Sequence, residues 1–132
     1  MIFVDASALI AILSQEPDAA ALADRLEMDA MRVCSAISVW EAIAGLCRSY
    51  ALTVPAARAD VARFLEAGDI RVVPIGAREG EIAVDAYARF GKGRHAAALN
   101  MGDCYAYACA KANGARLLFK GDDFGRTDIE PA

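Results

Sequence analysis

The sequence predicts an α/β fold, a three-layer α/β/α sandwich whose central, mainly parallel sheet has about four to five strands. Two observations predict it. Short apolar runs alternate along the chain with longer segments of helical periodicity, the pattern of a parallel sheet covered by helices on both faces. With 132 residues, 57% of them hydrophobic, the chain has the size and composition of one compact domain, which we assign to residues 1–132.

The first third of the chain has the pattern of strand, helix, helix and strand. Residues 2–4 are a β-branched and aromatic run, and SALIAIL at residues 7–13 has helical spacing. Apolar residues recur at helical spacing again over residues 18–28, and residues 32–34 can form a second strand. Asp5 therefore lies at a junction between a strand and a helix.

The middle of the chain predicts two helices and a third strand. Either Ser35 or Ser38 begins a helix that continues through residue 48, with Glu41 expected in its first turn. Thr53 begins the next helix, with a proline in its first turn, and residues 70–74 follow as a strand.

The last third predicts two helices, over residues 78–90 and 100–113, separated by a glycine-containing loop at residues 91–93. The run RLLF at residues 116–119 is the fourth strand. Trp40 and the aromatic residues of the last helix are expected in the core. The four cysteines occur singly in apolar segments, which indicates reduced, structural thiols rather than a zinc site.

Acidic side chains occur at the ends of the predicted elements. Asp5 follows the first strand, Asp122 and Asp123 follow the last, and Glu41 and Asp103 are expected in first turns of helices. If these ends converge at one edge of the sheet, the carboxylates share a cleft and repel one another unless a cation neutralises them. Carboxylate and water ligands suit Mg²⁺ or Mn²⁺, and such an ion lowers the pKa of a water that attacks phosphorus.

The same acids also have a purely structural interpretation. Ser38 and Glu41 have capping-box spacing, Asn100 and Asp103 form a weaker version, and Asp5 can cap the first helix. A non-catalytic interaction module, whose acids only cap helices, therefore stays open as an alternative. Caps do not explain the adjacent acids after the last strand.

Charge is segregated along the chain. The net charge of −4 and the isoelectric point near 4.9 argue against a protein that coats nucleic acid by bulk charge. Residues 86–120 nevertheless contain six basic residues and one acid: Arg89, Lys92, Arg94, Lys111, Arg116 and Lys120 against Asp103. A phosphate-bearing partner would therefore have to be met locally, by this segment, although such a cluster can equally be the solvated face of a helix.

Three stretches of the sequence have the form of known motifs. The first is the strand ending in Asp5-Ala-Ser7, and the second contains GKGRH at 91–95 and ALNMGDC at 98–104. The third is the closing LLFKGDDFGRTDI at 117–129. Together they resemble VapC-type PIN-domain toxins, and the resemblance covers nearly the whole chain in order. Ala96 departs from the pattern, since relatives commonly have proline there, which affects only the expected rigidity of the loop.

The resemblance implies a PIN-like fold and a magnesium-dependent endoribonuclease (Mn²⁺ as the other candidate ion) that cuts single-stranded, structured or loop RNA such as tRNA. It implies that Asp5, Glu41 and Asp103 are the central acids and that Asp122 or Asp123 supplies a fourth, with Asp122 preferred. In the expected mechanism Asp5 and Asp103 hold the ion while Glu41 and Asp122 position or activate water. Ser7 and Asp123 are expected to support the acids, and the expected RNA contacts are Lys92, Arg94 and His95.

The resemblance also implies a homodimer and a VapB-like antitoxin whose tail blocks the cleft. The apolar beginning of the chain is too short to span a bilayer and contains Asp5, so we expect no membrane association and a cytoplasmic location. A second enzymatic alternative is a phosphoaspartyl protein of the receiver or haloacid-dehalogenase kind, with Lys120 as its late lysine. Ser7 argues against the dehalogenase kind, which has a second aspartate at that position.

Overall fold

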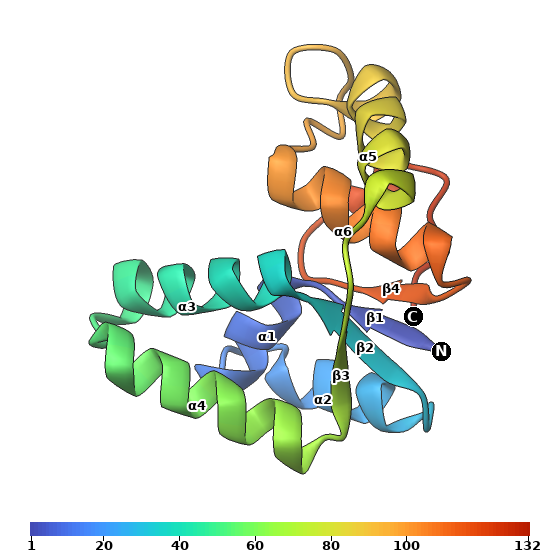
Figure 1. Ribbon diagram of the computed structural model, residues 1–132. Helices are drawn as coiled ribbons and strands as arrows, with labels where there is room; N and C mark the ends of the chain where they lie inside the picture. The colour runs from blue at the N-terminus through green and yellow to red at the C-terminus, as the bar shows by residue number, and fades with distance from the viewer.

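A four-stranded parallel sheet lies at the centre of the computed structural model, which describes residues 1–132 (Figure 1). The strand order is β3-β2-β1-β4, and the strands are β1 (Ile2–Val4), β2 (Arg32–Ser35), β3 (Ile70–Val73) and β4 (Arg116–Leu118). Ile2 of β1 pairs with Arg32 on one side and with Arg116 on the other. The predicted α/β fold and its parallel sheet are confirmed.

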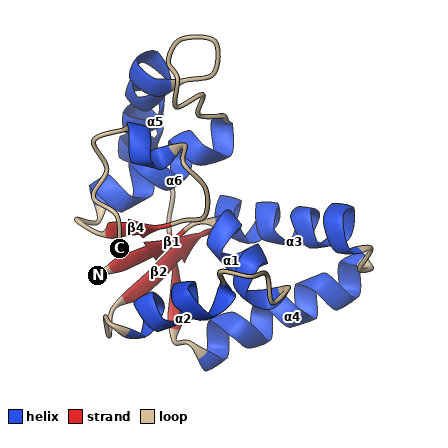
Figure 2. Ribbon diagram, turned by 180° about the vertical axis from the view of Figure 1, so that it is seen from behind, coloured by secondary structure: helices blue, strands red, loops and turns tan.

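Helices cover both faces of this sheet (Figure 2). One layer contains α1 (Ala6–Leu13), α2 (Ala19–Glu27), α3 (Ala36–Tyr50) and α4 (Val54–Ala67). The other contains α5 (Ala77–Phe90), α6 (Met101–Ala112) and the 3₁₀ turn η1 (Phe124–Arg126). Alternate strand residues enter the two cores, because Phe3 packs with the α5–α6 layer and Ile2 and Val4 pack with the α1–α4 layer.

Two helix starts follow the predicted capping chemistry. The side chain of Thr53 accepts a hydrogen bond from the backbone of Ala56 at the start of α4. Asn100 and Asp103 form a reciprocal capping box at the start of α6. These local signals depend only on neighbours in the chain, so they could be predicted without knowing the fold.

The start of α3 differs in part from prediction. Strand β2 extends to Ser35, which pairs with Val73 and caps α3 by accepting a hydrogen bond from the backbone of Ser38. Ser38 is therefore inside the first turn and is not the cap. Glu41 lies one turn further along α3, so its expected place in a first turn and the proposed Ser38–Glu41 capping box were both wrong.

Trp40 was also misassigned, because its side chain is 70% exposed instead of belonging to the core. The buried face of α3 consists of Ser38, Ala42, Gly45 and Leu46. Position 40 falls outside that stripe at helical spacing. Tyr107 on α6 is buried, as expected.

The cysteines are all unpaired, and three of them are buried. Burial raises the pKa of the Cys34 thiol to about 12, so this side chain is a packing group and not a nucleophile. None of the helices combines the length and the apolar character that a membrane crossing requires.

Candidate active site

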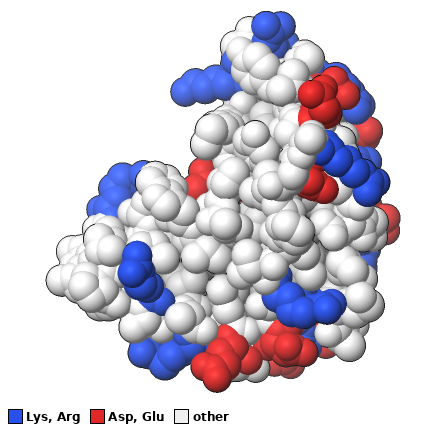
Figure 3. All heavy atoms as spheres, in the orientation of Figure 1, with Lys and Arg blue, Asp and Glu red and all other residues white.

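A pocket of about 270 Å³ opens where α1 and α3 of one layer meet the start of α6 in the other. Its polar lining consists of Asp5, Ser7, Glu41, Arg48, Asn100 and Asp103. In Figure 3 a notch separates the α3 side of the molecule from the α5–α6 side, with acidic atoms at its base and basic groups on both flanks. Three of the predicted acids, distant in the sequence, therefore line one pocket.

Asp5 lies at the carboxyl end of β1 and caps α1. Its carboxylate oxygen Oδ2 accepts hydrogen bonds from the backbone nitrogen of Ser7 at 2.9 Å and from the Ser7 hydroxyl at 2.5 Å. The side chain is only 4% exposed, and this burial raises its pKa although the Ser7 hydrogen bonds oppose the shift. The capping interpretation is thus correct for Asp5, but it leaves a buried carboxyl group in the pocket.

Ser7 links Asp5 to the last strand. While its hydroxyl donates to Asp5, its oxygen accepts a hydrogen bond from the backbone nitrogen of Lys120 at 3.0 Å. The backbone nitrogen of Asp5 also donates to the carbonyl of Leu118 at 3.0 Å. The ends of β1 and β4 are therefore held together beside the pocket.

Glu41 projects from α3 toward the start of α6. Burial and the charges of Asp5 and Asp103 raise its pKa to about 7, while Arg48 opposes the shift. Its carboxylate lies against Gly102, where a Cβ would overlap the carboxylate oxygens of Glu41. Only glycine at position 102 leaves room for Glu41 in this place.

Asp103 occupies the first turn of α6, as predicted. Its Oδ2 accepts a hydrogen bond from the backbone nitrogen of Asn100 at 2.9 Å, completing the capping box. Burial raises the pKa of Asp103 to about 6, and the charges of Asp5 and Asp123 add to the shift. Asp103 is thus a helix cap and a member of the acidic group at once.

Asp122 and Asp123 lie after β4 and are both exposed. Neither lines the pocket. Asp123 is nevertheless near enough for its charge to raise the pKa of Asp103, an effect in which Asp122 has no part. The electrostatics of the site therefore favour Asp123 over Asp122, the acid preferred from the sequence.

The chemistry of the pocket fits a hard divalent cation, although no three acidic, histidine or cysteine side chains lie together as a ready-made binding group. The polar groups beside the acids are a hydroxyl, an amide and a guanidinium, and the pocket lining contains no histidine or cysteine. Oxygen donors of this kind suit Mg²⁺ or Mn²⁺ rather than zinc. The raised pKa values of Glu41 and Asp103 mean that a cation would relieve the cost of ionising them.

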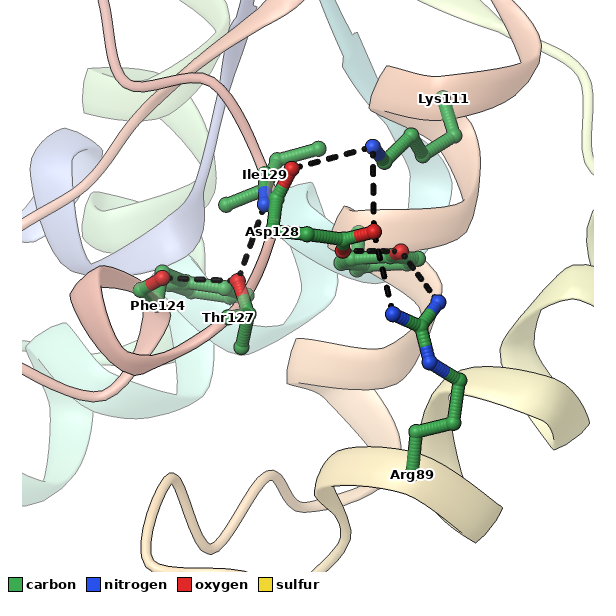
Figure 4. Close-up of polar contacts among 7 residues, drawn as sticks. Arg89, Lys111, Phe124, Thr127, Asp128 and Ile129 are labelled. Carbon is green, nitrogen blue, oxygen red and sulfur yellow. Dashed lines mark hydrogen bonds and ion pairs between the residues drawn. The ribbon is translucent and has the colours of Figure 1, made fainter.

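The basic residues of positions 86–120 do not form one continuous surface. Arg89 and Lys111 both contact Asp128, at 3.1 and 3.8 Å (Figure 4). Lys120 pairs with Glu16 and Asp18. Those three cations are therefore neutralised locally and are poor candidates for RNA contacts.

Arg116, Lys92 and Arg94 complete the predicted basic set, and His95 is the remaining expected RNA contact. Arg116 is a residue of β4 whose backbone is paired with Ile2 of β1, at the end of the sheet away from the carboxyl ends of the strands. Lys92 and Arg94 are exposed in the loop between α5 and α6 and make no ion pair, and the Arg94 guanidinium stacks 4.9 Å from the centre of the Tyr87 ring. The ring nitrogen Nδ1 of His95 accepts a hydrogen bond from the backbone of Ala97. Among the basic residues of this segment that form no ion pair, Lys92 and Arg94 are therefore the exposed ones, and both are in the loop.

Arg48 and Gly102 belong to the site but were not singled out from the sequence. Arg48 follows Glu41 by seven residues, a spacing that places both on one face of a helix, so this signal could have been used. Gly102 gives no such signal, because its importance depends on a side chain of a distant helix.

The family model described as "PIN domain" matches residues 2–130. Among characterised proteins, the chain is 40% identical to ribonuclease VapC30 of Mycobacterium tuberculosis over 96% of this chain and 94% of that protein. It is also 40% identical to a VapC ribonuclease of Rhizobium meliloti, over 98% and 99% of the two chains.

A solved structure with a similar fold is that of VapC20 of Mycobacterium tuberculosis, described as a sarcin-ricin loop cleaving toxin. The TM-score is 0.77 at 19% identity, and the match covers 100% of this chain and 98% of the other. At this level of identity the likeness supports the fold alone.

Proposed function

This chain belongs to the PIN-domain family, within its VapC ribonuclease group, and we propose that it is a metal-dependent endoribonuclease acting as the toxin of a VapBC-type pair. The observation that carries the proposal is the meeting of Asp5, Glu41 and Asp103 in one pocket. They come from β1, α3 and α6, and each has a raised pKa. Acids held this way fit a site that needs a divalent cation.

Asp5 and Asp103 are the proposed ligands of Mg²⁺ or Mn²⁺. When bound, such an ion stabilises negative charge on a phosphate and lowers the pKa of water. Ser7 holds the carboxylate of Asp5 in one orientation through the hydroxyl hydrogen bond. Asp123 is the proposed fourth acid on the strength of its charge near Asp103, with Asp122 as the other candidate.

Glu41 is the proposed general base. Its carboxylate lines the pocket with Asp5 and Asp103 and takes no part in a helix cap, so it is free to accept a proton from a water held there. The water oxygen then bonds to phosphorus while the bond from phosphorus to one ribose oxygen breaks, and that oxygen leaves with a proton from solvent. The products are two RNA fragments, one of which ends in a phosphate.

The proposed substrate is unpaired or loop RNA, for example in tRNA, because a pocket of about 270 Å³ between two helical layers has room for one strand rather than a duplex. Lys92, Arg94 and His95 are the proposed backbone contacts, supported by their exposure in the loop that leads into α6. We further propose a VapB-like antitoxin, a homodimer and a cytoplasmic location. The exposed side chains of Trp40, Val84, Tyr87 and Met101 offer apolar surface for protein partners.

The two alternatives have less support. In a phosphoaspartyl protein a late lysine must face the aspartate, whereas the ammonium of Lys120 pairs with Glu16 and Asp18. A module whose acids only cap helices does not account for Glu41, which caps nothing and shares the pocket with Asp5 and Asp103.

Digestion of total RNA tests the proposal. The wild-type protein is expected to cut RNA with Mg²⁺ and to stop when the ion is chelated, and Asp5→Asn is expected to lose cutting in both conditions. Asp60→Asn is the matched control, because Asp60 pairs with Arg63 on α4, outside the pocket. Equal cutting by the wild type and Asp5→Asn, with identical mapped ends, would overturn the proposed site.

A further inference from the structure

Arg48 is the only basic side chain that lines the acidic pocket. It lies in the last turn of α3, its side chain is exposed, and it forms no ion pair with any carboxylate. The positive charge of Arg48 acts on the carboxylate of Glu41, because it opposes the rise in the pKa of that group. A free guanidinium therefore shares a pocket with three acids.

The geometry of α3 directs this side chain toward the acids. Arg48 follows Glu41 by two helical turns, and side chains on a helix lean toward its N-terminus. Between them on the same face is Ala44, which lines the pocket, whereas the space beside Gly45 is filled by Ile10 of α1, another lining residue. Arg48 and Glu41 therefore flank a stretch of pocket wall made of small or apolar side chains.

The charge balance of the pocket calls for such a cation. Three ionised carboxylates carry one more negative charge than a divalent ion neutralises, and a phosphodiester brings another. No lysine and no second arginine lines the pocket. A guanidinium supplies one positive charge, and its parallel N–H groups match two oxygens of a phosphate.

We propose that Arg48 is the phosphate-binding residue of this pocket and that it donates hydrogen bonds to the non-bridging oxygens of an RNA phosphodiester held there. This inference rests on the proposed ribonuclease function and adds a substrate contact to it. It accounts for an unpaired arginine beside the acids and for how an acidic protein admits a polyanion to an acidic pocket.

The test measures RNA binding without cleavage, in a Glu41→Gln background that retains the size of the side chain. The probe is a fluorescein-labelled single-stranded RNA of mixed sequence with Mg²⁺. Adding Arg48→Gln is expected to raise the Kd about 10-fold and to reduce the slope of log Kd against log salt by about 0.7, one phosphate contact in a single strand. Arg48→Lys is expected to retain the salt slope with an intermediate Kd. Lysine supplies the same charge but not the two parallel N–H groups of a guanidinium.

Arg58→Gln is the matched control. Arg58 lies on α4 and lines two apolar pockets beside Trp40 but not the acidic one, so both Kd and slope are expected to stay unchanged. In the catalytically intact protein, Arg48→Gln is expected to raise KM more than it lowers kcat. If Arg48→Gln instead leaves KM unchanged and moves only the pH profile of kcat, Arg48 acts by tuning Glu41 and the inference is wrong.

Equal Kd values and salt slopes for Arg48→Gln and Arg58→Gln would also overturn it. Failure of the ribonuclease proposal has a different signature, since the wild-type protein would then cut no RNA in the presence of Mg²⁺. Arg48 is exposed at the end of a helix, so thermal unfolding of its variants is expected to match that of their background.

Discussion

Gly102 sets how closely Glu41 can approach the start of α6. A methyl group at this position would overlap the carboxylate of Glu41, which is the mobile tip of a side chain and can swing away. We therefore expect Gly102→Ala to fold normally, with stability unchanged or raised by up to about 1 kcal/mol, because alanine is the better helix former. Ribonuclease activity is expected to fall at least about 10-fold, because Glu41 leaves its position.

Gly80→Ala is the control for this change. Gly80 is also inside a helix, α5, but a Cβ there meets no atom within 4 Å. It is expected to share any gain in thermal stability and to retain full activity. If Gly102→Ala also keeps full activity, Glu41 does not act from the position seen beside α6.

Ser7 is a second residue whose role can be separated from folding. Its hydroxyl donates to Asp5 and accepts from the backbone of Lys120. Ser7→Ala removes a hydrogen bond that stabilises the ionised form of Asp5, so the pKa of Asp5 should rise further. Binding of Mn²⁺, measured by calorimetry, is expected to weaken about 10-fold.

The matched variant is Ser49→Ala, because Ser49 is exposed near the end of α3 and lies outside the pocket. It should bind Mn²⁺ as the wild type does. Identical Mn²⁺ affinities for the two serine variants would show that Ser7 only joins the strands.

At the scale of the elements, Asp128 connects the C-terminal segment, residues 119–132, to α5 and α6. Tyr107 donates a hydrogen bond to Asp128 at 2.6 Å, and the Arg89 guanidinium contacts the same carboxylate (Figure 4). Tyr107→Phe is expected to lower the free energy of unfolding by about 1 kcal/mol, because it removes a hydrogen bond to a charged group and leaves the ring in place. Removing Arg89 should cost less, since that ion pair is about half exposed.

Denaturant unfolding checks this order of effects, with Tyr105→Phe as the control. Tyr105 is also on α6, and its hydroxyl makes no hydrogen bond within the protein. A loss as large in Tyr105→Phe as in Tyr107→Phe would mean that the Asp128 contact does not fasten the segment.

The elements also show what the sequence could and could not predict. The capping box of Asn100 and Asp103 and the cap at Thr53 are local signals and were predicted. The start of α3 was left open between two serines of similar chemistry, and pairing of Ser35 with Val73 in the sheet decides it. The exposure of Trp40 depends on which face of α3 is buried, information that periodicity within one helix did not supply.

At the scale of the whole molecule, the candidate site is assembled from both helical layers. Asp5 and Glu41 come from the side of α1 and α3, whereas Asp103 comes from α6 on the other face. Parallel strand order brings these ends to one edge, which is why the convergence of acids could be predicted from the fold class. The contacts between layers, such as Gly102 against Glu41, require the folded molecule.

This assembly makes the stability of the metal-free protein depend on pH. The pKa values of about 7 for Glu41 and about 6 for Asp103 exceed those of about 4 expected in the unfolded chain. Between about pH 4 and pH 7 the folded protein therefore holds protons that the unfolded chain has released. The free energy of unfolding is expected to fall as pH rises through this window. Carboxylates with lowered pKa values, such as Asp128, act in the opposite sense, but only below about pH 4.

A divalent ion should remove this penalty, because it takes the place of the protons. Millimolar Mg²⁺ is therefore expected to raise Tm by several degrees at pH 8 and by much less at pH 5.5, where protons compete with the ion. Differential scanning fluorimetry at both pH values measures this, with the Glu41→Gln, Asp103→Asn double variant as the comparison. That variant is expected to lose the response to Mg²⁺ and most of the pH slope, with the part due to the buried Asp5 retained. A response of equal size at the two pH values, or one retained by the double variant, would locate ion binding away from these carboxylates.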